Sequence, residues 1–304
     1  MVKPDALHPG DTVGVVSPAA AVEGAYLERG VAALTTMGYR VKVSDHALDR
    51  AGILAGEDHV RAAELSAFFA DDEVKAIFAA RGGYGCGRIL PLIDFGALRR
   101  RPKIFMGFSD ETYLLNAIVD QCGIVTFHGP MVAVDFAHGV DGAARNHLIS
   151  LLAGEAGNFA LAAKTIVGEG QARGELIGGS LSVVVAMLGT PWEPRFDGRI
   201  LFLEDTGEKA YRVDRMLTQL RQSGILKRVA GIVFGAIHPV NGSAAERSLI
   251  EDFIAGQTGY LGVPVLSGLE AGHGTAYFVL PFGVEAQIDS ATRRLVFTES
   301  PVKA

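Results

Sequence analysis

The sequence contains little cysteine and tryptophan and has no long hydrophobic run. Among its 304 residues are two cysteines, Cys86 and Cys122, and one tryptophan, Trp192. The cysteines form no CxxC motif and no metal-binding spacing. Two cysteines allow one disulfide, but we favour two free thiols in a reducing cytosol. The uncharged run over residues 176–192 is broken by glycine and proline. It is shorter than the ~20 apolar residues that a membrane span needs.

Export signals, basic surfaces and metal motifs are lacking as well. The N-terminal residues show no apolar stretch behind a basic start, so we expect no signal peptide and a cytoplasmic protein. Lys and Arg number 28 against 34 Asp and Glu, a formal net charge of −6, and they form no basic cluster. We therefore expect no nucleic-acid partner and no membrane partner. HExxH, Cys/His clusters and EF-hand loops are missing, so we expect no metal and no cofactor.

Glycine is abundant instead, with 38 residues spread over many short clusters. Hydrophobic residues make up 49% and charged residues 20%, a balance typical of a soluble globular chain with a sizeable core. The length fits two domains. We expect an N-terminal domain over residues 1–153 and a C-terminal domain over residues 154–304.

The order of predicted elements indicates an α/β fold. In the first half, short β-branched runs alternate with amphipathic stretches, which predicts βαβ units and a mostly parallel sheet. The second half contains further predicted strands and helices and closes with a predicted hairpin over residues 286–298. Residues 130–170 look less regular, and we place the connection between the domains there. The predicted strands cover residues 12–17, 40–43, 74–80, 104–107, 124–127, 172–178, 200–203 and 230–236, and the predicted helices cover 23–37, 59–69, 111–119, 211–222 and 244–254, with another from residue 181.

Ser109 stands where a predicted strand turns into a predicted helix. The sequence around it is Gly-Phe-Ser-Asp-Glu. A serine at such a turn has an exposed hydroxyl beside free backbone N–H groups, as in a nucleophile elbow. The match to G-x-S-x-G is partial because Glu111 replaces the second glycine. The alternative is that Ser109 only caps the helix.

A glycine cluster over residues 81–88 also follows a predicted strand. Such turns bring backbone N–H groups close to a ligand and suit either a phosphate or the oxyanion of an acyl transfer. The cluster is neither a G-x-G-x-x-G nor a P-loop sequence, which gives phosphate binding little support. A tight structural turn is the other alternative. Arg81 and Arg88 flank the cluster and are candidates to contact a substrate carboxylate.

One histidine, His273, is bracketed by glycines. The flanking glycines predict an exposed and sterically tight loop, so we do not expect this histidine to be a core residue. His128 and His238 are its rivals, because both lie near the ends of predicted strands. The sequence alone does not choose among the three by spacing.

Glu204 and Asp205 follow a predicted strand at its carboxyl end, where α/β proteins bind ligands. Their alternative role is to begin the next helix as solvated acids. A hydrolase without a metal needs a nucleophile, a base and a group that orients the base. Ser109, His273 and Glu204 could fill these three roles.

Taken in order, the motifs resemble those of the LD-carboxypeptidases, serine peptidases that include the microcin C self-immunity peptidase. The resemblance covers nearly the whole chain, and the order and spacing of the motifs are more specific than any one of them. It implies a triad of Ser109, Glu204 and His273, and an oxyanion hole made by the backbone N–H groups of Asp110 and Gly83. The matching motifs lie at residues 9–18, 80–85, 107–110, 178–181, 189–192, 203–205, 211–217 and 272–274.

The resemblance also implies a fold, a reaction and a partner. It implies an α/β fold of two domains in a cytoplasmic homodimer. The first is a Rossmann-like, parallel-sheet domain that bears the serine, and the second is a mixed α/β domain that bears the glutamate and the histidine. The implied substrate is a muropeptide, a small peptide cut between the L-centre of diaminopimelate or lysine and a terminal D-alanine. The cut passes through an acyl-enzyme and serves peptidoglycan recycling.

Two other functions stay open. An amidase of the microcin C type has the same fold and triad but acts on peptidyl or aminoacyl nucleotides, for which it needs an aromatic shelf. Residues 129–170 contain no Trp or Tyr, which favours the muropeptide. A non-catalytic nucleotide- or sugar-binding module would use the glycine cluster, but it has no need of Ser109, Glu204 and His273 together.

Overall fold

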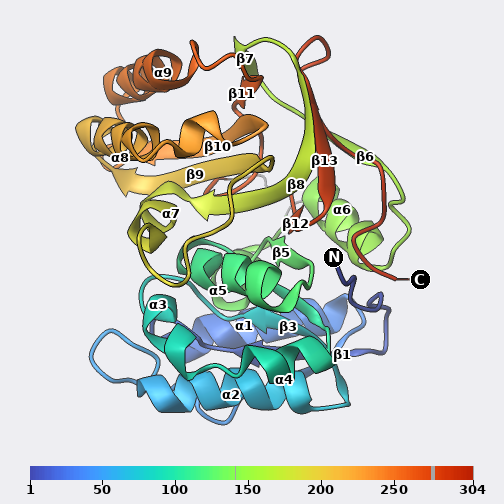
Figure 1. Cartoon of the computed structure of the whole chain (residues 1–304). Coiled ribbons are helices and arrows are strands. Elements are labelled where there is room, and N and C mark those ends of the chain that lie inside the picture. The colour runs from blue at the N-terminus through green and yellow to red at the C-terminus, as the bar shows by residue number, and fades with distance from the viewer. Residues whose placement is uncertain (141, 275–277, 304) are drawn as a thin grey trace. The chain divides into compact units, whose positions relative to one another are not determined.

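A computed structural model of the chain describes residues 1–140, 142–274 and 278–303 (Figure 1). Its contacts divide the chain into two compact units. The first unit contains Met1–Ala156, Tyr277–Gly283 and Ser300–Ala304, and the second contains Gly157–Ala276 and Val284–Glu299. The chain thus leaves the first unit and returns to it twice. The expected domain ranges 1–153 and 154–304 stay a prediction.

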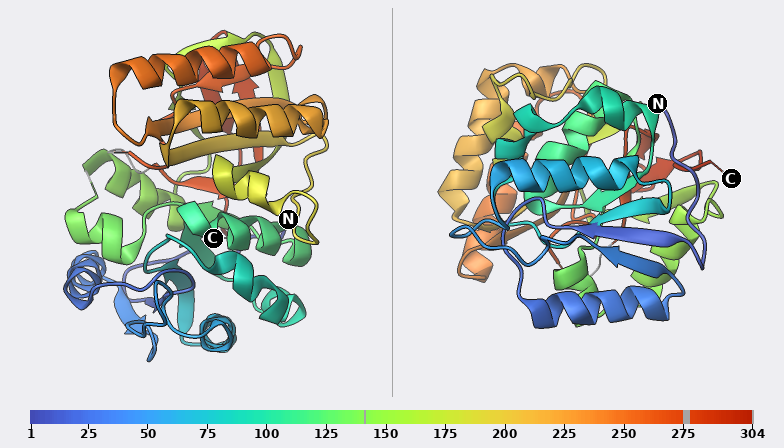
Figure 2. Two further views of the ribbon diagram at one scale, coloured as in Figure 1. Left: turned by 90° about the vertical axis from the view of Figure 1, so that its left-hand side faces the viewer. Right: turned by 90° about the horizontal axis from the view of Figure 1, so that it is seen from below.

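The first unit is built on a six-stranded sheet in the order β12-β5-β4-β3-β1-β2. Each pair of neighbours is parallel except β12 with β5. Helix α1 lies on one face of the sheet, and helices α2 and α4 lie on the other (Figure 2). The strands are β1 (Thr12–Val16), β2 (Arg40–Val43), β3 (Val74–Ala79), β4 (Ile104–Gly107), β5 (Thr126–His128) and β12 (Leu280–Phe282). The helices are α1 (Gly24–Thr36), α2 (Asp58–Ala70), α3 (Cys86–Ile89), α4 (Phe95–Arg100), α5 (Thr112–Ala117) and α6 (Gly142–Leu152), with short turns η1 (Leu90–Leu92), η2 (Ser109–Glu111), η3 (Ile118–Cys122) and η4 (Val132–Phe136).

Buried hydrophobic runs form the strands of this sheet. All five residues of β1 are buried, as expected of a strand that is covered on both faces. Helix α2 turns Leu65, Phe68 and Phe69 inward at helical spacing. Gly14 of β1 makes room for Phe68, since a Cβ on Gly14 would stand 2.3 Å from Cδ1 of Phe68. Strand β1 pairs with β3, and β3 pairs with β4; both candidate turns start at the carboxyl ends of β3 and β4.

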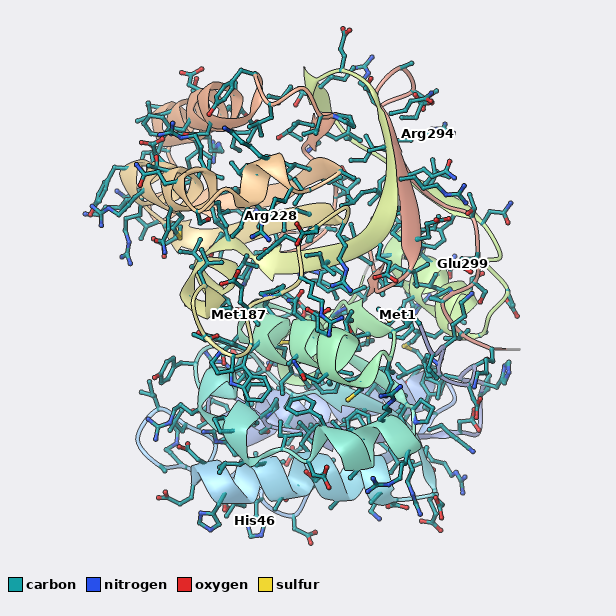
Figure 3. All side chains as sticks on the ribbon, viewed as in Figure 1. Met1, His46, Met187, Arg228, Arg294 and Glu299 are labelled. Carbon is teal, nitrogen blue, oxygen red and sulfur yellow. The ribbon has the colours of Figure 1, made fainter. Side chains whose placement is uncertain are left out.

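The second unit is built on an eight-stranded mixed sheet in the order β6-β14-β13-β8-β9-β10-β11-β7. The run from β8 to β11 is parallel, and the outer pairs are antiparallel. Helices α7, α8 and α9 lie along one face of the parallel strands (Figure 2). Buried and more exposed residues alternate along β14, whose Arg294 points outward in Figure 3. The strands are β6 (Phe159–Ala162), β7 (Thr165–Gly168), β8 (Gln171–Ser180), β9 (Ile200–Glu208), β10 (Gly231–Pro239), β11 (Val265–Ser267), β13 (Glu285–Asp289) and β14 (Arg294–Phe297), and the helices are α7 (Leu181–Met187), α8 (Ala210–Gln222), α9 (Ala244–Thr258) and the short η5 (Ile225–Lys227).

The predicted α/β class is confirmed, with a Rossmann-like parallel sheet in the first half and a mixed sheet in the second. The closing hairpin is confirmed as β13 and β14. Residues 130–170, which look less regular in the sequence, are more regular than expected, because η4, α6, β6 and β7 lie there. Helix α6 buries Ala144, Leu148 and Leu151 at helical spacing, but the glycines around it obscure this pattern. Strands β6 and β7 lie at the two edges of their sheet, where exposure is too uneven to give a clear alternation.

Three further observations concern the whole of the described chain. No helix within it combines the length and the apolar character needed to cross a membrane. No group of three or more His, Cys, Asp or Glu side chains within it is placed to hold a metal ion. Both cysteines are buried free thiols, as the sequence predicts. Burial raises the pKa of Cys122 to about 11 and also raises the pKa of Cys86, which makes both thiols unreactive at neutral pH.

Candidate active site

Ser109 sits on a strained turn in the first unit. Strand β4 ends at Gly107, Phe108 is extended, and Ser109 opens η2 with a φ of 66°. A positive φ costs a residue with a side chain roughly 1–2 kcal/mol, and such strain is a mark of the nucleophile elbow. The alternative role as a helix cap is wrong, because Phe108 and Glu111 hold the N-cap positions of η2 and α5. The backbone at Ser109 therefore has the shape expected of an elbow.

The glycine cluster places its turn directly against Ser109. Strands β3 and β4 are neighbours, so the turns that follow them lie side by side. A Cβ on Gly82 would stand 2.9 Å from the Cβ of Ser109 and 3.1 Å from its Oγ, an approach that only glycine allows. Gly83 follows with a φ of 106° and is exposed. The backbone N–H groups of Gly83 and Asp110 stay our prediction for the oxyanion hole.

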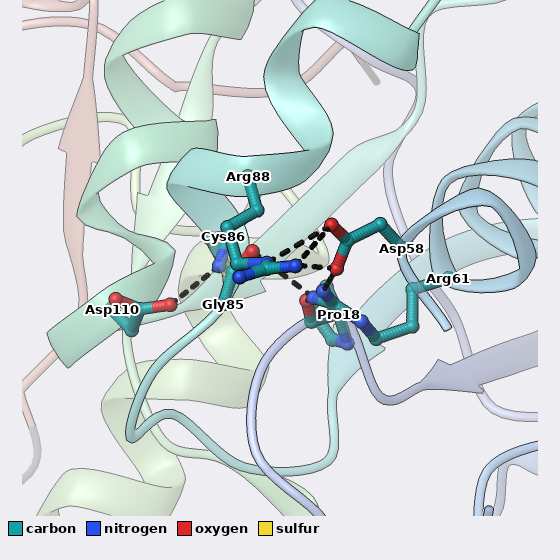
Figure 4. Close-up of polar contacts among 7 residues, drawn as sticks. All are labelled: Pro18, Asp58, Arg61, Gly85, Cys86, Arg88 and Asp110. Atoms are coloured by element: carbon teal, nitrogen blue, oxygen red, sulfur yellow. Dashed lines mark hydrogen bonds and ion pairs between the residues drawn. The ribbon is translucent and has the colours of Figure 1, made fainter. Parts of the chain in front are cut away.

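Asp110 ties the serine turn to the glycine cluster. Its Oδ2 accepts a hydrogen bond of 2.7 Å from the backbone N–H of Cys86, the residue after Gly85 (Figure 4). The Asp110 side chain is buried, and burial raises the pKa of its carboxyl group. Its side chain is therefore engaged in holding the two turns together.

Arg61 of α2 braces the same cluster. Its side chain is 1% exposed, and its guanidinium donates to the carbonyl oxygens of Pro18 and Gly85 and to the Asp58 carboxylate (Figure 4). Arg88 pairs with the same carboxylate at 2.8 Å. Hydrogen bonds from Arg88 and Arg61 hold the pKa of the Asp58 carboxyl group below its usual value. The cluster is thus fixed from α2 through a buried cation.

We expect Arg61→Ala to lower the free energy of unfolding by about 3 kcal/mol, because it leaves two carbonyl oxygens and a carboxylate without their buried donor. Urea unfolding of the purified protein measures the loss. Arg88→Ala is the matched control, since it removes the other cation of Asp58. The Arg88 side chain is 49% exposed, and an exposed ion pair contributes at most about 1 kcal/mol. Equal losses in the two variants would contradict the role given to Arg61.

Glu204 and His273 form a close pair in the second unit. Glu204 lies inside β9 and is fully buried. Its Oε2 lies 2.6 Å from Nδ1 of His273 and also accepts a 3.0 Å hydrogen bond from the His273 backbone N–H. Gly272, with a φ of 92°, permits this contact, because a Cβ there would stand 2.5 Å from the Cγ of Glu204. A carboxylate at Nδ1 holds the proton on that nitrogen, so Nε2 is the unprotonated nitrogen that can accept a proton.

The strand that carries this glutamate is longer than predicted. β9 runs to Glu208 and α8 begins only at Ala210. The alternative that Glu204 and Asp205 are solvated acids at a helix start is therefore wrong, since they are 0% and 3% exposed. The Oδ2 of Asp205 accepts a 2.7 Å hydrogen bond from the backbone N–H of Ser182. Asp205 thus anchors α7, while Glu204 faces His273.

The two rival histidines have other surroundings. His128 lies in β5 of the first unit, buried with its ring centroid 5.6 Å from those of Phe108 and Phe282. His238 lies at the exposed end of β10, with Nε2 3.8 Å from the point where a Cβ on Gly274 would stand. The structure pairs His273 with a buried carboxylate, which is the arrangement that a general base needs.

Sequence reasoning does not find Arg61. It could have been found from its position in the predicted helix, because it stands four residues before Leu65 and therefore lies on the same, buried face. A charged residue on a buried face needs partners. Of the two arginines that the sequence does single out, Arg88 is held in the ion pair described above. Arg81 is exposed and donates to the carbonyl oxygen of Ala21 at 3.3 Å.

Both halves of the chain match a single protein family. Residues 13–129 match the LD-carboxypeptidase N-terminal domain, and residues 173–288 match the LD-carboxypeptidase C-terminal domain. The chain belongs to the LD-carboxypeptidase family. The probable murein peptide carboxypeptidase of Bacillus subtilis is 39% identical to it, over 97% of this chain and 93% of the relative.

Two crystal structures show how far the LD-carboxypeptidase fold extends. The muramoyltetrapeptide carboxypeptidase from Oxalobacter formigenes is 31% identical with a TM-score of 0.82, over 94% of this chain and 97% of its own. The MccF-like protein from Bacillus anthracis is 26% identical with a TM-score of 0.89, over 98% of this chain and 100% of its own. The same fold therefore occurs in relatives of both names.

Each unit of this LD-carboxypeptidase holds part of what a serine peptidase needs. The first unit supplies Ser109 on a strained turn, with a glycine turn beside it. The second unit supplies the imidazole of His273, oriented by Glu204. That Ser109 and His273 act on one another stays a prediction.

Proposed function

We propose that this chain is a serine LD-carboxypeptidase that hydrolyses the bond between the L-centre of diaminopimelate or lysine and the terminal D-alanine of a muropeptide. The observation that carries the proposal is the 2.6 Å contact between Oε2 of Glu204 and Nδ1 of His273, in a chain of the LD-carboxypeptidase family. A histidine oriented by a carboxylate can act as the general base that takes the proton of a serine nucleophile, and Ser109 is our candidate for that nucleophile. The names of two relatives, a probable murein peptide carboxypeptidase and a muramoyltetrapeptide carboxypeptidase, support the same substrate class.

The proposed reaction has two halves. Nε2 of His273 takes the proton of the Ser109 hydroxyl as Oγ attacks the amide carbonyl carbon. The N–H groups of Asp110 and Gly83 bind the oxyanion, and losing one such donor typically costs about 10²–10³ in rate. His273 then gives its proton to the amino group of D-alanine, and the C–N bond breaks. A water then loses a proton to His273 as it attacks the acyl-enzyme, and His273 returns this proton to Oγ of Ser109 as the ester C–O bond breaks. Glu204 stabilises the imidazolium in both halves.

We also place the enzyme in the cytoplasm as a homodimer in peptidoglycan recycling, as the family resemblance implies. Sedimentation of the purified protein tests the dimer. A species of about twice the 32.1 kDa chain mass is expected. A species at the chain mass across the concentration range would contradict it.

The deciding experiment offers the purified protein the tetrapeptide L-Ala-γ-D-Glu-meso-diaminopimelate-D-Ala and follows D-alanine by mass spectrometry. Release by the wild type and not by Ser109→Ala is expected. The matching lysine tetrapeptide then gives the preference for the third residue. Cleavage of an aminoacyl sulfamoyl-adenylate without release of D-alanine would favour the microcin C type of amidase. Failure on both substrates, with no labelling by a serine-directed reagent, would contradict the peptidase and favour a binding module.

A further inference from the structure

Glu111 occupies a slot beside the candidate nucleophile that two glycines leave open. It stands two residues after Ser109, where the G-x-S-x-G pattern has glycine, and it is 0% exposed. A Cβ on Gly107 would stand 2.9 Å from the Cγ of Glu111, and a Cβ on Gly82 would stand 3.1 Å from its Oε2. The side chain is thus wedged between the end of β4 and the glycine turn.

The same glycine brings the carboxyl group of Glu111 close to the serine hydroxyl. The point at which a Cβ on Gly82 would stand lies 3.1 Å from Oγ of Ser109 as well as from Oε2 of Glu111. The two oxygens therefore face one glycine. In a buried site a charge on one of them acts on the other far more strongly than it would in water.

The surroundings of the carboxyl group favour its uncharged form. Cys86 of α3 places its Sγ 4.0 Å from Oε1, and Oε2 has no hydrogen-bond partner within the described residues. Two charged neighbours act on it, Asp110 from η2 and Arg81 from the glycine cluster. Burial first, and then the charge of Asp110, raises the pKa of the Glu111 carboxyl group well above its usual value. A hydrogen bond from the backbone N–H of Glu111 itself and the charge of Arg81 offset only part of this rise.

We propose that Glu111 is a positioning residue for Ser109 and that the slot accepts it only as the uncharged acid. In that form the side chain fills the space between the two turns and holds Ser109 against Gly82, as attack geometry requires. Ionisation puts a negative charge beside the oxygens on which the reaction itself develops negative charge, so turnover falls. Activity therefore has an alkaline limb that belongs to Glu111. The inference rests on the proposed function, in which Ser109 is the nucleophile.

The first test compares kcat and KM of the wild type, Glu111→Gln and Cys86→Ala from pH 5 to pH 10. Glutamine has nearly the shape of the uncharged acid and cannot ionise. We expect Glu111→Gln to keep kcat within about threefold of the wild type at pH 6 and to stay flat where the wild type falls about tenfold or more, with KM unchanged. Cys86→Ala is expected to keep the wild-type fall, which excludes the neighbouring thiol as its cause. Glu111→Ala empties the slot and is expected to lower kcat about tenfold or more throughout.

A second readout does not depend on the peptide substrate. The rate at which a fluorophosphonate labels Ser109 is expected to show the same alkaline fall in the wild type and not in Glu111→Gln. If labelling shows this difference but D-alanine is not released, the proposed substrate is wrong and the role of Glu111 stands. Superimposable pH profiles of the two proteins overturn the inference, and so does a Ser109 that cannot be labelled at any pH.

A third readout is the stability of the two proteins. An acid whose pKa is raised in the folded state loses its stabilising contribution as pH rises from its unfolded value of 4.5 through its folded value. The free energy of unfolding of Glu111→Gln relative to the wild type is therefore expected to increase as pH rises from 4.5. A difference that does not change with pH overturns the claim that the slot accepts only the uncharged acid.

Discussion

Ser109→Ala is expected to lower kcat for D-alanine release by about 10⁶-fold, the effect that loss of the nucleophile has in serine hydrolases. The variant has no oxygen that can form the acyl-enzyme, and only binding and the oxyanion hole still act. Alanine fits the turn about as well as serine, because both carry a single Cβ at the φ of 66°. Mass spectrometry of released D-alanine measures the loss, and the melting temperature is expected to stay close to that of the wild type.

Ser66→Ala is the matched control for this substitution. Ser66 lies in α2 of the same unit, where its hydroxyl donates to the backbone carbonyl oxygen of Ala62 at 2.8 Å. We expect the control to retain full turnover. Should folded Ser109→Ala keep more than about a hundredth of wild-type kcat, the nucleophile lies elsewhere.

Glu204→Gln is expected to lower kcat by about 10⁴-fold, as loss of the orienting carboxylate does in triad enzymes. A single oxygen of Glu204 now accepts from both the backbone N–H and Nδ1 of His273. An amide is uncharged, so it holds the protonated imidazole less well and can present an N–H to Nδ1 instead of an oxygen. Because Glu204 is fully buried, water does not replace the lost interaction. Steady-state turnover and urea unfolding together measure the effect.

Asp205→Asn is the control for the Glu204 variant, since it changes the next carboxylate along the same strand. Asp205 accepts hydrogen bonds from the backbone N–H groups of Ser182 and Thr206, at 2.7 Å and 2.8 Å. We expect this variant to lose about 1–3 kcal/mol of stability while kcat changes by less than about tenfold. If Asp205→Asn lowered kcat as much as Glu204→Gln does, the loss of kcat could not be assigned to the pair of Glu204 and His273.

The fold could be predicted largely from local patterns. Buried β-branched runs such as β1 and amphipathic helices such as α8 are determined by their own residues, so their positions agree with the sequence within a few residues. The sequence predicts the end of β9 too early, at residue 203 instead of Glu208, because Glu204 and Asp205 look like surface acids in isolation. Their burial depends on contacts with Gly272 and Ser182, which lie far from them in the sequence. The length of β9 is therefore set by tertiary contacts and not by its own residues.

The candidate site shows the same division. Ser109 and His273 can be found from their immediate sequence neighbours. Each lies on a tight turn of the backbone, and such turns need glycines close by in the sequence. Arg61 and Glu111 carry weaker local signals, since each becomes important only when segments far apart in sequence close around it. For Glu111, the one visible sign is a large residue at the position where an elbow normally has glycine.

The strand β12 has a consequence for how the protein is made. It pairs with β5 at the edge of the first sheet, yet a ribosome synthesises it about 150 residues after β5. At a synthesis rate of about 5–20 residues per second, the edge of β5 that pairs with β12 stays open for roughly 8–30 s in the nascent chain. Open edges recruit strands from other chains. We therefore expect the emerging chain to depend on ribosome-associated chaperones, and a message cut short before codon 277 to yield a product that aggregates through β5.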